Sequence, residues 1–183
     1  MIHLDNITKR HGHIGVIVAA LTATALCQSL WAGEPAVGYE MSYVANQAHG
    51  SHVAEGRYQR VIDGLAGASH DPVVKYLNLC VAQTMASRYP DARRSCNRAV
   101  ELSEGAARSA PDDLRDEHHA NWAVALSNRG VLRAIRGQQG AEDDFRQAIE
   151  LQAQSEVAGR NLARLNAPNV DARAVVDVAT AGD

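Results

Sequence analysis

Aromatic residues, excess positive charge and strand-like patterns are all scarce in this sequence. Aromatic side chains make up 4% of the 183 residues, and the formal net charge is −3. Without a basic field, nothing attracts nucleic acid or an acidic membrane surface, so we expect neither as a partner. Alternation of β-branched residues occurs only weakly, in residues 172–179 near the C-terminus. Alanine, the best helix former, is abundant, and the composition therefore predicts an all-α fold.

Motifs of the common catalytic sites are also missing. The sequence contains no P-loop, no dinucleotide fingerprint and no G-x-S-x-G elbow. Its acidic run at residues 142–144 falls at the start of a predicted helix, where carboxylates complement the helix dipole. Glu142 can pair with Arg146 four residues later. We interpret this run as a solvated helix surface and predict neither catalysis nor a cofactor.

The histidines lack the spacing of metal ligands. The candidates are His49 with His52, His118 with His119, and His70 alone. Neighbouring residues on a helix point about 100° apart, so His118 and His119 do not converge on one ion. No Cys/His or carboxylate set has zinc-site spacing. We predict surface histidines and no metal. The alternative function is an envelope enzyme without a recognised motif, or a metal-binding helical protein, that uses these histidines.

The N-terminal segment has the layout of an export signal. A polar, mildly basic start precedes an apolar, uncharged run at residues 14–26, and Ala32 stands just before a turn-prone stretch. The apolar run is short for a membrane span unless it is extended to Trp31. We predict that residues 1–32 are a cleaved signal peptide, which leaves a periplasmic or secreted protein with no membrane insertion. An uncleaved N-terminal membrane anchor and an ordinary buried helix are the alternatives.

Helical periodicity becomes clear only beyond the first quarter of the chain. We expect residues 33–52 to form a linker or a weak N-terminal helix, residues 53–166 the helical domain and residues 167–183 a flexible tail. Within the domain, Asp71 followed by Pro72 predicts the end of one helical unit and the start of the next, because proline fits the first turn of a helix. A final helix would cap the exposed face of the preceding ones.

Residues 121–152 form the clearest helix pair. Apolar residues recur at helical spacing on both sides of a short break at 137–140, and two amphipathic helices so close together must fold back on each other. A pattern with the spacing small-x3-large-x2-small occurs twice in the sequence. A small residue precedes each copy, Cys80 before the first and Gly130 before the second. We expect the intervening residues 103–113 to form a longer connection. The two copies are 49 positions apart: Ala92-Cys96-Ala99 and Ala141-Phe145-Ala148.

This pattern resembles the tetratricopeptide repeat, a pair of antiparallel helices whose small residues mark their closest approach. The resemblance covers about residues 56–166 and implies two to three degenerate repeats, stacked as a short solenoid with a C-terminal capping helix. The family period is about 34 residues, so a connection or a helix must be lengthened between the two clear copies. Members of the family usually bind another protein. The resemblance therefore implies an interaction module or scaffold of the cell envelope without catalysis; an unrelated helical bundle is the alternative fold.

The resemblance also implies where a polypeptide partner binds, because ligands in this family lie along the first helix of each repeat. The matching helices here are residues 73–87 and 121–136. Asn78 and Asn128 each stand two positions before the small residue of their repeat, where an amide can bond a peptide backbone as both donor and acceptor. The alternative is that both are ordinary polar residues of a helix surface. The predicted site adds an apolar floor and a basic edge to the asparagines: Asn78, Val81, Asn128, Val131, Arg129 and Arg133.

The cysteines gain a role from the same resemblance. Signal cleavage removes Cys27 and leaves Cys80 and Cys96, one on each helix of a single repeat. Their positions in the repeat imply that they face each other, and an exported protein is oxidised. We predict a disulfide between them. The alternative is a pair of reduced cysteines that act as small core residues.

Overall fold

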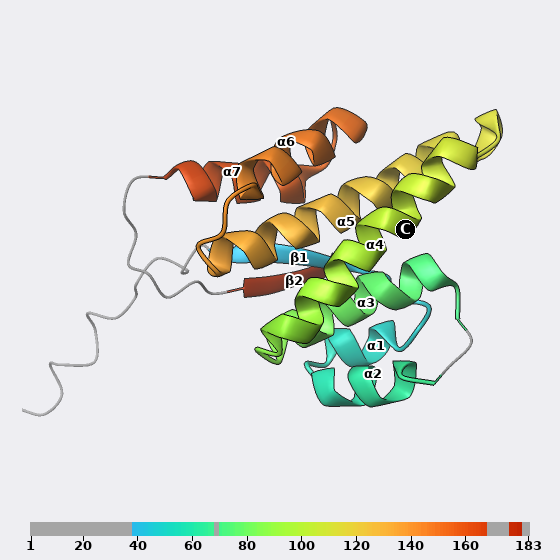
Figure 1. Cartoon of the computed structure of the whole chain (residues 1–183), viewed down its shortest axis with the longest axis vertical. Helices are drawn as coiled ribbons and strands as arrows, with labels where there is room; N and C mark the ends of the chain where they lie inside the picture. Colours follow the sequence, from blue (N-terminus) through green and yellow to red (C-terminus); the bar gives the residue numbers. More distant parts are fainter. Residues whose placement is uncertain (1–37, 68–69, 168–175, 181–183) are drawn as a thin grey trace, which may run out of the picture. The chain divides into compact units, whose positions relative to one another are not determined.

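The computed structural model describes residues 38–67, 70–167 and 176–180, all of which belong to the unit Pro35–Asp183. The predicted signal peptide at residues 1–32 lies outside the described residues. Most of the described chain is helical, as the composition predicts (Figure 1). A short strand comes first, and a second strand follows the last helix. The elements are β1 (Tyr39–Tyr43), α1 (Gly50–Ala54), α2 (Tyr58–Leu65), α3 (Pro72–Met85), α4 (Tyr89–Ser109), a 3-10 turn (Asp112–Leu114), α5 (Arg115–Ile135), α6 (Ala141–Leu151), α7 (Glu156–Asn166) and β2 (Val176–Thr180).

Local sequence explains where the helices begin. The Asp71 carboxylate caps α3 by accepting the backbone N–H groups of Val73 (2.8 Å) and Val74 (3.1 Å), and Pro72 occupies the first turn. This satisfies donors that have no partner inside the helix. Helix α6 begins after Gly140, whose φ of 85° lies in the left-handed region that glycine adopts without strain. The proline and glycine signals in the sequence therefore mark real helix boundaries.

Consecutive helices pack against each other through close contacts at small residues. The pairs α3–α4, α4–α5 and α5–α6 form the main helix contacts, and α7 packs on α6 and α5 (Figure 1). At Gly130 in α5, a Cβ atom would lie 2.6 Å from the ring of Phe145 in α6. Glycine is therefore required for these two helices to approach so closely. The equivalent positions of the preceding pair are Cys80 and Cys96, which form the predicted disulfide between α3 and α4. Closing a loop of 16 residues is worth about 3 kcal/mol in chain-entropy models.

The predicted long connection at residues 103–113 is wrong over most of its length. Helix α4 continues through Gly105 to Ser109, and α5 begins at Arg115 after the 3-10 turn. Gly105 is exposed, while Ser103 and Ala107 are buried on either side of it. Burial on both sides outweighs the helix penalty of one exposed glycine, about 1 kcal/mol. The extra length between the two repeat copies is therefore helix.

Two expectations outside the helical domain are corrected by the strands. Residues 33–52, expected to be a linker or weak helix, contain β1 and the start of the short helix α1, and residues 167–183, expected to be a flexible tail, contain β2. The strands pair in parallel, with Tyr39 opposite Val176 and Tyr43 opposite Thr180. Each strand depends on a partner more than a hundred positions away, so local periodicity could not predict the pairing. The weak alternation at residues 172–179 is the one sequence signal for β2.

Candidate polypeptide-binding site

Three asparagines on three different helices bind the backbone of β1. They are Asn78 on α3, Asn128 on α5 and Asn161 on α7, and each is at most 1% exposed. Among the helices, β1 packs mainly against these same three (Figure 1). A buried amide must find partners for both its oxygen and its nitrogen. Here the strand backbone supplies both.

Each asparagine forms the same pair of hydrogen bonds with one residue of β1 or with the residue that directly follows the strand. Asn161 accepts the N–H of Glu40 and donates to its C=O, both at 2.8 Å. Asn128 accepts from Ser42 at 2.9 Å and donates to it at 2.7 Å, and Asn78 does the same to Val44 at 2.9 and 3.0 Å. The N–H and C=O of one extended residue point to the same edge, and alternate residues share that edge. The three asparagines thus bind one edge of a continuous extended backbone.

Asn78 also holds the turn that follows the strand. Its Nδ2 contacts the C=O groups of Gln47 and Ala48, both at 3.1 Å. Ala48 and His49 have φ values of 46° and 62°, in the left-handed region that non-glycine residues rarely adopt. Such residues cost on the order of 1–3 kcal/mol each and persist where the surroundings fix them. The amide of Asn78 is one of the groups that stabilises this turn.

The opposite edge of β1 faces β2. Because residues 40, 42 and 44 direct their backbone groups to the asparagines, residues 39, 41 and 43 direct theirs to the other edge, where β2 pairs. Among the side chains, Met41 is fully buried and Tyr43 is 6% exposed. Val81 and Val131 belong to the same buried cluster. The predicted apolar floor is therefore part of the core together with β1, and neither valine is open to a separate partner.

Side chains at the start of β1 tie it to α6 and α7. The Tyr39 ring stacks on Phe145, with ring centroids 6.5 Å apart. Burial raises the pKa of Tyr39, and the charge of Arg164 offsets only part of that rise. The Glu40 carboxylate accepts two hydrogen bonds from Arg160, at 2.8 and 2.7 Å. Hydrogen bonding to Arg160 lowers the pKa of Glu40, and the carboxylate in turn raises the pKa of Arg160. These contacts fix the first residues of the strand.

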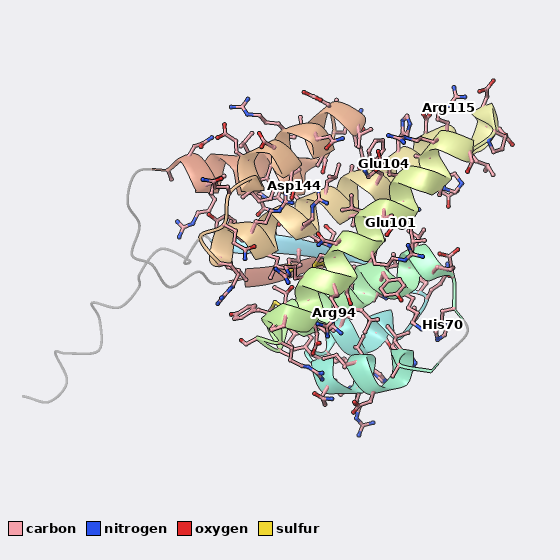
Figure 2. The ribbon with its side chains drawn as sticks, viewed as in Figure 1. His70, Arg94, Glu101, Glu104, Arg115 and Asp144 are labelled. Atoms are coloured by element: carbon pink, nitrogen blue, oxygen red, sulfur yellow. A yellow bond between two sulfur atoms is a disulfide. The ribbon has the colours of Figure 1, made fainter. Side chains whose placement is uncertain are left out.

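Both arginines of the predicted basic edge bind a buried carboxylate on α6. Arg129 binds the Asp144 carboxylate through two hydrogen bonds, at 3.0 and 2.7 Å, and Arg133 binds it at 2.8 Å. Figure 2 labels Asp144 on α6, where that helix faces α5. A carboxylate only 3% exposed orients both arginines toward α6, and their contact with a polypeptide partner stays a prediction.

Asp144 therefore also departs from the predicted solvated run, whereas Glu142 does pair with Arg146, at 2.6 Å, on the helix surface. A helix places residues 142 and 144 on different faces, so one carboxylate reaches solvent while the other turns to α5.

The sequence reasoning missed Asn161. Two signals pointed to it: Asn161 follows Asn128 by 33 positions, close to the family period of about 34, and it stands two positions before the small residue Ala163. The sequence pattern predicts the helix that carries it only as a cap. In the structure, α7 supplies the third asparagine and Arg160, so it contributes to the site as fully as α3 and α5 do.

Three of the histidine candidates come together, but without metal-site geometry. The ring centroid of His49 lies 5.7 Å from that of His52 and 5.8 Å from that of His70, which is labelled in Figure 2. His52 Nδ1 contacts the Arg57 guanidinium at 2.9 Å. Within residues 38–67, 70–167 and 176–180, no group of three His, Cys, Asp or Glu side chains could hold a metal ion. His118 and His119 lie apart from this group, on α5.

In the part of the chain that the structure describes, no helix combines the length and the apolar character that a membrane span requires.

Comparisons with known protein families, with characterised proteins and with solved structures find no significant match to this chain.

Proposed function

We propose that this chain is an exported interaction module of the tetratricopeptide type, which binds an extended polypeptide beside β1, the strand held on the face formed by α3, α5 and α7, and performs no catalysis. One observation carries the proposal: three buried asparagines, one on each of these helices, bind the backbone of an extended strand. The ladder fixes β1 through paired donors and acceptors, which holds the opposite edge of the strand in register for main-chain pairing with a polypeptide of almost any sequence. The small-residue contacts between successive helices support the solenoid arrangement.

Export is the second part of the proposal. The Cys80–Cys96 disulfide joins two fully buried cysteines, and disulfides persist in oxidising compartments such as the periplasm or the outside of the cell. The apolar run at residues 14–26 supplies the signal for this route. The mass of the protein purified from the cell envelope reports cleavage after the signal, and a difference of two hydrogens reports whether the cysteines are joined.

Because β1 occupies this face, a partner meets the strand and not the asparagines. Replacing Asn78 and Asn128 by alanine would release a strand that belongs to the core, so those variants cannot separate binding from folding. A crosslinker placed in β1 makes a cleaner test. Tyr39 is half-buried at the start of the strand and is the test position. Arg94 is the control position, because it lies exposed on α4, the second helix of the pair α3–α4 (Figure 2).

The test replaces Tyr39 or Arg94 by the photo-crosslinking residue p-benzoylphenylalanine in the full chain, followed by illumination in the cell envelope and mass spectrometry of the adducts. We expect a reproducible polypeptide adduct at position 39 and none at position 94. Equal adducts at both positions, or none at either, would contradict the proposal. Metal analysis of the same purified material addresses the alternative, because a stoichiometric ion would favour a metal-binding role for the histidines.

A further inference from the structure

The two strands of the small sheet are held very unequally. Strand β1 packs against α3, α5 and α7, and asparagine amides bind both backbone groups of Glu40, Ser42 and Val44. Strand β2 packs mainly against β1. An isolated pair of short strands is marginally stable in water. Strand β1 is therefore a fixed part of the domain, whereas β2 is joined to it chiefly along one edge.

The paired edge of β1 has the properties of a site for strand addition. Its outward backbone groups, those of residues 39, 41 and 43, are held in register because the inward groups are fixed to three helices. Because β1 is already ordered, only the incoming segment has to lose conformational entropy when the two strands pair. Main-chain hydrogen bonds then supply the affinity, as in other cases of strand addition.

We propose that this edge of β1 is the binding site for an extended segment of another protein, which pairs in parallel with β1 and displaces β2. The inference rests on the proposed function and assigns its binding site. Strand β2 shows which chemistry fits there: five residues, with valine at alternate positions 176 and 178 and a polar residue between them. The C-terminal segment is thus an intramolecular competitor for the partner.

The register defines which backbone groups an occupant must supply. Met41 stands opposite Val178, so in a parallel ladder its N–H and C=O pair with Asp177 and Ala179. The N–H groups of Val176 and Val178 point to the outer edge instead. Methylation of the backbone nitrogen at 177 and 179 therefore blocks pairing with β1, while methylation at 176 and 178 leaves it intact and keeps every side chain.

The first test uses a labelled synthetic peptide with the sequence of residues 174–183 and the full chain carrying Ala179→Pro, which removes one paired N–H of β2. We expect the peptide to bind this variant at least about tenfold more tightly than the unmodified chain, where the tethered β2 competes. Methylation at 177 and 179 should abolish binding, and methylation at 176 and 178 should not. Absence of peptide binding to the variant, or equal loss with both methylated peptides, would overturn the proposal. Circular dichroism of both proteins controls for folding.

The second test adds the same peptide as a competitor in the crosslinking experiment with the photo-crosslinker at position 39. Loss of the foreign adduct supports the proposed binding site. A foreign adduct that persists at saturating peptide overturns the site while the interaction function stands, and absence of any adduct overturns the function itself. An adduct between two copies of this chain would show exchange of β2 between copies and overturn the assignment to another protein.

Discussion

The side-chain amide of Asn128 binds both backbone groups of Ser42, a residue 86 positions earlier in the chain, at 2.9 and 2.7 Å. This single contact joins the middle of the central helix α5 to the middle of β1. Asn78 and Asn161 repeat it at Val44 and Glu40. The face that the sequence assigns to a polypeptide partner is thus already occupied by a strand of the same chain.

Asn128→Ala should destabilise the protein strongly. The substitution leaves the N–H and C=O of the buried residue Ser42 without partners, and each unsatisfied buried group costs about 1–3 kcal/mol. We expect a loss of about 2–4 kcal/mol in the free energy of unfolding, measured by urea titration. Asn97→Ala is the matched control, because Asn97 is exposed on α4 and its loss should change stability by less than about 0.5 kcal/mol. Equal effects in the two variants would contradict the role of Asn128.

Gly130→Ala should force α5 and α6 apart. Its Cβ would lie 2.6 Å from the Phe145 ring, and overpacking of this kind costs about 1–3 kcal/mol. Gly159→Ala on α7 is the control, because a Cβ there meets no atom within 4 Å. Alanine at 159 should stabilise the helix by up to about 1 kcal/mol. Thermal unfolding of both variants checks the contrast, and Phe145→Leu should partly rescue Gly130→Ala by making room.

Asp144→Ala should cost far more than Glu142→Ala, although both residues lie on α6 and pair with arginine. The Asp144 carboxylate is 3% exposed and binds Arg129 and Arg133, whereas Glu142 is 47% exposed. Loss of Asp144 leaves two partly buried cations without their carboxylate, which we expect to cost about 2–3 kcal/mol. Loss of the surface pair should cost at most about 0.5 kcal/mol. Chemical denaturation measures the free energy of unfolding of both variants. Equal losses would show that the carboxylate of Asp144 contributes no more than an exposed one.

Glu40 should give the protein a small dependence of stability on acid. Hydrogen bonding to Arg160 lowers the pKa of Glu40 below 4.5, so its stabilising contribution is present above that pH. The contribution disappears as the pH falls through the lower pKa of the folded protein. Because the Arg160 side chain is 49% exposed, solvent screens the pair, and we expect the effect to stay under about 1 kcal/mol. Urea titrations at neutral pH and near pH 3 should show a larger fall in stability for the unmodified chain than for Glu40→Gln; an identical fall would contradict this prediction.

The sequence by itself determined the features that depend on short-range patterns. Helical periodicity and Asp71-Pro72 predicted the helices, and the resemblance carried by the small-x3-large-x2-small spacing implied the disulfide between Cys80 and Cys96. The same spacing placed Asn78 and Asn128 on equivalent positions of their helices. Both then prove to bind an extended backbone, and whether they contribute to binding a separate polypeptide stays a prediction. The helix signals involve neighbouring residues, and the match between the two copies is visible by comparing the sequence with itself.

Only the tertiary structure decided what lies on that face. Strand β1 forms because asparagines from three distant helices satisfy its backbone, and β2 forms because β1 presents its other edge. Asp144 is buried because two arginines of α5 surround it. The asparagine partners of β1 lie 34 to 121 positions away from it. Arg129 and Arg133 are 15 and 11 positions from Asp144 but belong to another helix, so all these hydrogen bonds exist only once the helices have packed. Local propensity carries no information about such contacts, so the occupied state of the face could not be predicted from the chain alone.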